Sequence, residues 1–86
     1  MASFAQANRE SAARGHGLEE FFKLGMMCST GHSMPIDMVA AHKWFNLAAL
    51  RGSRDAIRLR NEVAAEMSAA EIAAAQRAAR TWLTQH

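Results

Sequence analysis

Along most of this chain, apolar residues recur three and four positions apart, the spacing that places side chains on one face of an α-helix. The run Met38, Ala41, Trp44, Ala48 is one example. The pattern predicts five helices, over residues 3–14, 18–30, 37–51, 54–67 and 69–84. No segment alternates apolar and polar residues as a half-buried strand does, so we expect one all-α domain of four or five helices. Short connections predict that successive helices are antiparallel neighbours.

Capping residues lie where these helices are expected to begin and end. Asp37 and Ser53 precede two of the predicted helices and can accept hydrogen bonds from the free amides of the first turn. Ser68 and Glu71 have the spacing of a capping box before the last helix. Gly52 suits the left-handed conformation that ends many helices. Residues close in sequence therefore predict where three helices begin and where one of them ends.

The segment 18–30 is apolar on nearly every side, which is typical of a helix buried between neighbours. Gly25 lies inside it, where glycine costs about 1 kcal/mol relative to alanine. We therefore expect a neighbouring backbone to approach too closely for a methyl group. Phe21 and Phe22 are expected to need a cover, from the N-terminal stretch, a second copy of the chain or a partner.

Small and bulky residues in the middle of the chain follow a pattern known from helical repeats. Residues 21–56 resemble one Sel-one-like repeat, a helical hairpin related to the tetratricopeptide repeat. Ten positions carry the likeness: Leu24, Gly25, Gly31, Asp37, Ala41, Trp44, Ala48, Ala49, Gly52 and Ala56. The segment that resembles the repeat covers about two-fifths of the chain. Cys28 departs from the family pattern, which usually has tyrosine there.

The resemblance implies an α-α superhelix with an N-terminal arm at 1–17, one repeat at 18–56 and C-terminal capping helices at 57–86. It also implies a non-catalytic adaptor, often bacterial, that binds a protein partner. If the family pattern turns Gly25 and Cys28 towards the neighbouring helices, an opposite line of the first repeat helix faces the partner. That line, the outer stripe, consists of Glu19, Lys23, Met26 and Thr30.

The composition indicates a chain with too small a core to be stable without a binding partner or a second copy. Half of the 86 residues are hydrophobic, but many of these are alanine, so few large side chains remain for a core. A lone repeat also leaves one end of its stack uncovered, and we therefore expect self-association or a partner. The single cysteine suits the reducing cytoplasm, and neither a membrane span nor a secretory signal is visible.

Two chemical alternatives rest on Cys28 and the histidines. Cys28 with His32 or His42 is the only candidate for a thiol dyad, and the same residues with His16 could suggest a metal site. Their spacing matches no common metal-ligand pattern. We expect a packed thiol and solvated histidines, with His42 on the polar side of its helix, and hence no enzyme, metal or cofactor.

A third alternative concerns Arg51, Arg54 and Arg58, which place three cations around the Gly52 turn. Such a face could contact phosphates and make the chain a small nucleic-acid-associated regulator. Asp55 and Glu62 lie three and four positions from Arg58, which predicts ordinary ion pairs within the helix instead. The net charge of +2 permits nucleic acid without favouring it.

Overall fold

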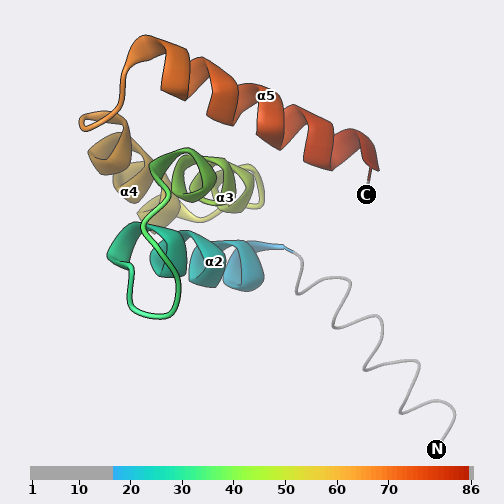
Figure 1. Cartoon of the computed structure of the whole chain (residues 1–86). Helices are drawn as coiled ribbons and strands as arrows, with labels where there is room; N and C mark the ends of the chain where they lie inside the picture. Colours follow the sequence, from blue (N-terminus) through green and yellow to red (C-terminus); the bar gives the residue numbers. More distant parts are fainter. Residues whose placement is uncertain (1–16, 86) are drawn as a thin grey trace, which may run out of the picture.

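The fold is all-helical over residues 17–85, the part of the chain described by the computed structural model (Figure 1). Its helices are α2 (Leu18–Thr30), α3 (Met38–Leu50), α4 (Arg54–Ala64) and α5 (Ala69–Gln85). The all-α prediction and four of the predicted helices are confirmed. The predicted helix at 3–14 and most of the predicted arm lie outside the described residues. Among the described helices, none has the length and apolar character needed to cross a bilayer.

The predicted N-terminal caps are confirmed. Asp37 Oδ1 accepts a hydrogen bond from the Ala40 amide at 3.0 Å, and Ser53 Oγ accepts one from the Ala56 amide at 3.1 Å. At the start of α5, the Ser68 amide donates to Glu71 Oε1 at 2.9 Å, and the Glu71 amide donates to Ser68 Oγ at 3.1 Å. These reciprocal bonds form a capping box, so local sequence explains where three helices begin.

Glycines follow the ends of α2 and α3, whereas α4 ends earlier than the sequence predicts. Gly31 and Gly52 both have positive φ, at 72° and 106°. The helix predicted to reach residue 67 ends at Ala64 instead. The amides of Glu66 and Met67 donate to carbonyls only three residues back, which tightens the last turn out of α-helical geometry.

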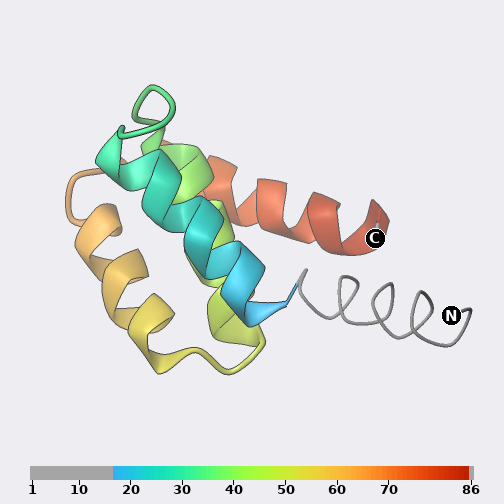
Figure 2. The same cartoon turned by 90° about the horizontal axis from the view of Figure 1, so that it is seen from below.

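Helix α3 occupies the centre of the structure (Figures 1 and 2). Among the described helices, only α3 packs extensively against each of the others, and it lies between α2 and α5. The prediction that successive helices pack as neighbours is wrong for α4 and α5. The connection 65–68 sends α5 across to α3, and α4 and α5 make little contact with one another.

The core combines small residues with a few large buried side chains, among them the ring of Phe45. Ala41, Ala48 and Ala56 are fully buried, as the spacing predicted. Gly25 faces the ring of Phe45, which is 0% exposed, and a Cβ on Gly25 would lie 2.6 Å from Phe45 Cε1. The expectation of a close backbone at Gly25 is therefore wrong, because an aromatic side chain fills that space.

Aromatic rings from two other helices, α3 and α5, cover Phe21 of α2. Its ring lies 5.8 Å from that of Trp44 in a stacked arrangement and 4.9 Å from that of Trp82 edge to face, centroid to centroid. Phe21 is 1% exposed. Phe22 is half-buried and packs edge to face on Phe45 at 5.8 Å. Phe21 is thus covered by rings of its own chain, contrary to the expectation that it needs a separate cover, whereas Phe22 has a ring partner and stays partly exposed.

Helix α2 is buried on one side only. Phe21, Gly25 and Cys28 are buried, whereas Leu18 and Met26 are 39% and 37% exposed. The prediction of a helix buried all round is wrong, because α2 packs mainly on α3. One face of α2 is therefore available on the surface.

Candidate functional site

The four residues of the outer stripe are all exposed. Glu19, Lys23, Met26 and Thr30 follow one line of α2 at spacings of four, three and four. The hydroxyl of Thr30 donates to the Met26 carbonyl at 2.8 Å, within the last turn. The structure therefore brings the predicted partner-binding residues together on a solvent-facing surface.

A small hollow adjoins this stripe. It encloses about 290 Å³ between the first turns of α2 and the start of α4. Its lining combines apolar and charged side chains: Leu18, Glu19, Phe22, Lys23, Ser53 and Asp55. Two residues of the outer stripe thus border a concave surface that a second helix, α4, helps to form.

A larger hollow lies where α2, α3 and α5 meet, and we call it the acidic groove. It encloses about 770 Å³. Buried and half-buried apolar side chains form its floor: Leu24, Cys28, Met34, Met38 and Trp44. Exposed Ile36, Asp37 and Glu71 lie at its edge. Sequence reasoning missed this groove because its lining comes from three helices and from the loop between α2 and α3.

Cys28 is packed at the floor of the acidic groove. It is 4% exposed, and its Sγ lies 3.6 Å from Met34 Sδ, towards which the thiol donates. Burial, and then the nearby Asp37 charge, raise the pKa of the Cys28 thiol, while Lys43 lowers it. A thiol held protonated in an apolar site is a weak nucleophile. The predicted packing of Cys28 is confirmed.

The prediction for His42 is wrong. This residue is 4% exposed, on the buried side of α3, and its Nδ1 has no hydrogen-bond partner within residues 17–85. Burial, followed by the charge of Arg60, lowers the pKa of the His42 imidazole below 6.5. Arg60 itself is held by Asn46, whose Oδ1 accepts from Nη1 at 2.8 Å. His32, by contrast, is exposed in the loop before α3.

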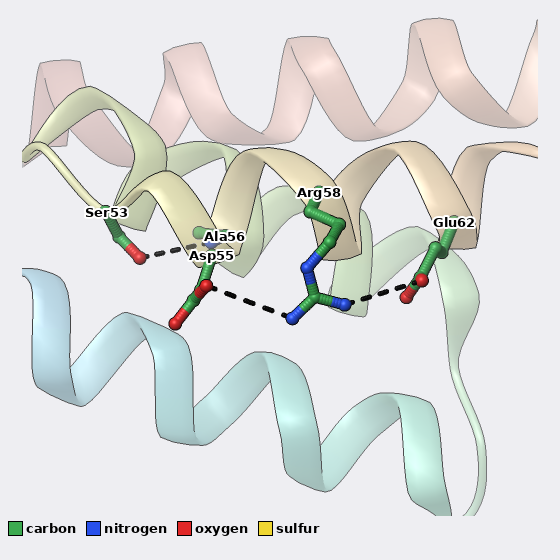
Figure 3. A network of polar contacts seen from close by, with 5 residues as sticks. All are labelled: Ser53, Asp55, Ala56, Arg58 and Glu62. Carbon is green, nitrogen blue, oxygen red and sulfur yellow. Dashed lines mark hydrogen bonds and ion pairs between the residues drawn. The ribbon is translucent and has the colours of Figure 1, made fainter.

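The arginines differ in their pairing. Figure 3 shows Arg58 between Asp55 and Glu62 on the side of α4 turned towards α2. Arg58 Nη2 lies 3.9 Å from Asp55 Oδ1, and Nη1 lies 3.5 Å from Glu62 Oε1. The predicted ion pairs are confirmed. Arg51 and Arg54 are exposed and form no ion pair within the described part of the chain.

The ten repeat-like positions mostly serve packing and chain turns. Ala41, Ala48 and Ala56 are fully buried, and Trp44 belongs to the aromatic cluster. The others fill the core or mark a helix end: Leu24, Gly25, Gly31, Asp37, Ala49 and Gly52. Residues 17–85 contain no group of three acidic, histidine or cysteine side chains placed to hold a metal ion.

Comparison with family models, with curated proteins and with solved structures found no match to this chain. The resemblance to Sel-one-like repeats therefore rests on the ten positions themselves and stays a prediction.

Proposed function

We propose that this chain is a non-catalytic, Sel-one-like interaction module that binds a protein partner or a second copy of itself in the cytoplasm. The observation that carries the proposal is the exposure of the whole outer stripe of α2 beside a concave surface. An adaptor needs a surface of this kind, with apolar and charged side chains together, because apolar area contributes affinity and charge contributes specificity.

The outer stripe offers such a mixture over a short distance. Met26 supplies a flexible apolar contact that adapts to different partners. Glu19 and Lys23 lie one helical turn apart and line the hollow together with Leu18. The side chains need no rearrangement of the core to be reached, since all four residues of the outer stripe are exposed. A partner segment can therefore contact α2 without unfolding the domain.

The experiment is quantitative affinity capture from an extract of the source organism. Wild-type protein is compared with Lys23→Glu/Met26→Asp, which should lose the partner. The matched control is Arg77→Glu/Gln76→Asp on exposed positions of α5, which changes the net charge by the same amount and should keep it. Equal capture by all three proteins, each shown by circular dichroism to be folded, would refute a role for the outer stripe.

The alternative role as a nucleic-acid-associated regulator has weaker support. Of the three arginines of this face, Arg58 already has two carboxylate neighbours, which leaves Arg51 and Arg54 available to phosphates. Two such contacts give low affinity and a shallow dependence on salt. If Arg51→Gln/Arg54→Gln reduces binding to duplex DNA or single-stranded RNA at low salt, this alternative gains the support that it now lacks.

A further inference from the structure

The acidic groove combines an apolar floor with unpaired carboxylates at its edge. Ile36, 60% exposed, projects beside Asp37 at the start of α3, and Glu71 lies in the first turn of α5. Apart from the buried Cys28 thiol, Asp37 and Glu71 are the only ionisable side chains that residues 17–85 contribute to its lining. The groove therefore suits an apolar ligand that carries positive charge.

Both carboxylates are held in place by the backbone and remain without a cation. Each accepts one amide hydrogen bond as part of a helix cap. Neither forms an ion pair among the described residues. Lys43, next to the groove residue Trp44 in α3, directs its Nζ to a Trp44 ring, 4.0 Å from the ring centre, and pairs with neither carboxylate. The two carboxylates are thus positioned in advance for an incoming cation.

A surface with the opposite character lies around the turn between α3 and α4, and we call it the basic ridge. It consists of Leu50, Arg51, Arg54 and Ile57. Leu50 is 62% exposed and Ile57 is 41% exposed, so both are large apolar side chains in solvent. Arg51, which follows Leu50 in the chain, and Arg54, the first residue of α4, are exposed as well. Arg54 and Ile57, three positions apart in α4, lie on one face of that helix.

The acidic groove and the basic ridge are at opposite ends of α3. The groove includes Asp37 and Met38 at the start of this helix, and Leu50 is its last residue. Thirteen residues of α-helix span about 20 Å. Because α3 is rigid, the basic ridge cannot reach the groove of the same chain, although it can reach the groove of another.

We propose that the basic ridge of one copy docks in the acidic groove of a second copy, in a head-to-tail contact. Leu50 and Ile57 would contact the groove floor and Ile36, and Arg51 and Arg54 would pair with Asp37 and Glu71. This inference rests on the proposed function as an interaction module and names a second copy as one partner. Since the two surfaces differ, each bound copy offers a free groove or ridge, and the contact can repeat along a row.

The test is sedimentation equilibrium of the wild type and of two double variants, one in the groove and one in the ridge. Asp37→Asn/Glu71→Gln removes both groove charges and keeps the caps, because asparagine and glutamine cap nearly as well. Arg51→Glu/Arg54→Glu reverses the charge of the ridge at two exposed positions. We expect the average mass of the wild type to rise with concentration. We expect the dissociation constant of each variant to be about tenfold higher, which is the scale of two lost ion pairs. Association should also weaken between about 50 mM and about 500 mM NaCl, because screening shortens the reach of charges.

The decisive measurement is made on a mixture of the two variants. The groove variant keeps an intact ridge and the ridge variant keeps an intact groove, so the mixture should form a complex that stops at two chains. A contact between two identical surfaces would not be restored in this way. The inference is overturned if the wild type stays monomeric up to about 1 mM. A dissociation constant of that size corresponds to a binding free energy of only about 4 kcal/mol. It is also overturned if either variant associates like the wild type, or if the mixture stays monomeric.

A third protein separates this inference from the proposed function. Lys23→Glu/Met26→Asp alters the outer stripe of α2 and leaves the groove and the ridge intact, so it should self-associate like the wild type. Loss of partner capture with unchanged self-association supports both proposals as independent surfaces. A monomeric wild type that still captures a partner through the outer stripe overturns the head-to-tail contact alone.

Discussion

Gly25 and the ring of Phe45 occupy positions that exclude any larger residue at 25. A Cβ there would lie 2.6 Å from Cε1 and 2.7 Å from Cδ1 of a phenylalanine that is 0% exposed. Because Phe45 is enclosed, its ring has little room to move away. The packing of α2 on the Phe45 ring of α3 therefore depends on the absence of a side chain at Gly25.

Gly25→Ala should lower the free energy of unfolding by about 1 kcal/mol, even though alanine is the better helix former. Overpacking of a filled core costs roughly 1–3 kcal/mol, which outweighs the gain of about 1 kcal/mol in helix propensity. Gly25→Leu should cost more. Urea denaturation measures both changes.

The control for this prediction is Phe45→Leu, which removes part of the ring. In that background Gly25→Ala should cost less than in the wild type, and the difference is the coupling between the two positions. If Gly25→Ala stabilises the wild type by its full helix propensity, the close approach of the ring is not a constraint.

Trp44→Ala should destabilise the domain by roughly 3 kcal/mol, the usual range for losing a large aromatic side chain from a packed site. Trp44 stacks on Phe21 and meets Trp82 with ring centroids 6.3 Å apart, so its loss opens the aromatic cluster of three helices. Thermal unfolding followed by circular dichroism measures the change. Leu83→Ala, at an exposed site, should stay within about 1 kcal/mol.

Stability should fall as the pH drops below the usual pKa of histidine. Because burial and Arg60 lower the pKa of His42 in the folded chain, the unfolded chain binds the proton more readily. The contribution of neutral His42 is therefore complete above about pH 6.5 and is lost progressively below it, by at most about 1.4 kcal/mol per pH unit.

Two glutamine variants isolate this effect. His42→Gln removes the titrating group and should flatten the dependence of the unfolding midpoint between about pH 5 and pH 7. His32→Gln, at an exposed loop position, should leave it as in the wild type. The same slope in both variants would assign the pH dependence to other groups.

Cys28 should react slowly with a thiol reagent in the folded protein and quickly in denaturant. The thiol is 4% exposed and its pKa is raised, so both access and the thiolate fraction are low. A matched control places cysteine at the exposed end of α2, as Thr30→Cys in a Cys28→Ser background, and should react quickly without denaturant. Fast labelling of wild-type Cys28 would contradict the packed site and reopen the thiol-dyad alternative.

Part of the fold and of the candidate site could be predicted because it depends on local chemistry. The caps at Asp37, Ser53 and Ser68 bond to amides within three residues, so their spacing fixes where the helices begin. The exposure of the outer stripe follows from helical periodicity once Gly25 and Cys28 face inward. Each depends on residues a few positions apart, which a single sequence contains.

Contacts between distant segments were decided only by the tertiary structure. Periodicity placed His42 on a polar side, yet α4 packs over it and brings Arg60 close. Spacing alone did not reveal that Phe45, rather than backbone, fills the gap at Gly25. Nor did it reveal that α5 crosses to α3 and brings Glu71 to the groove of Asp37. Local sequence determines which residues share a helix face, whereas the relative placement of faces depends on how rings and small side chains from several helices fill space together.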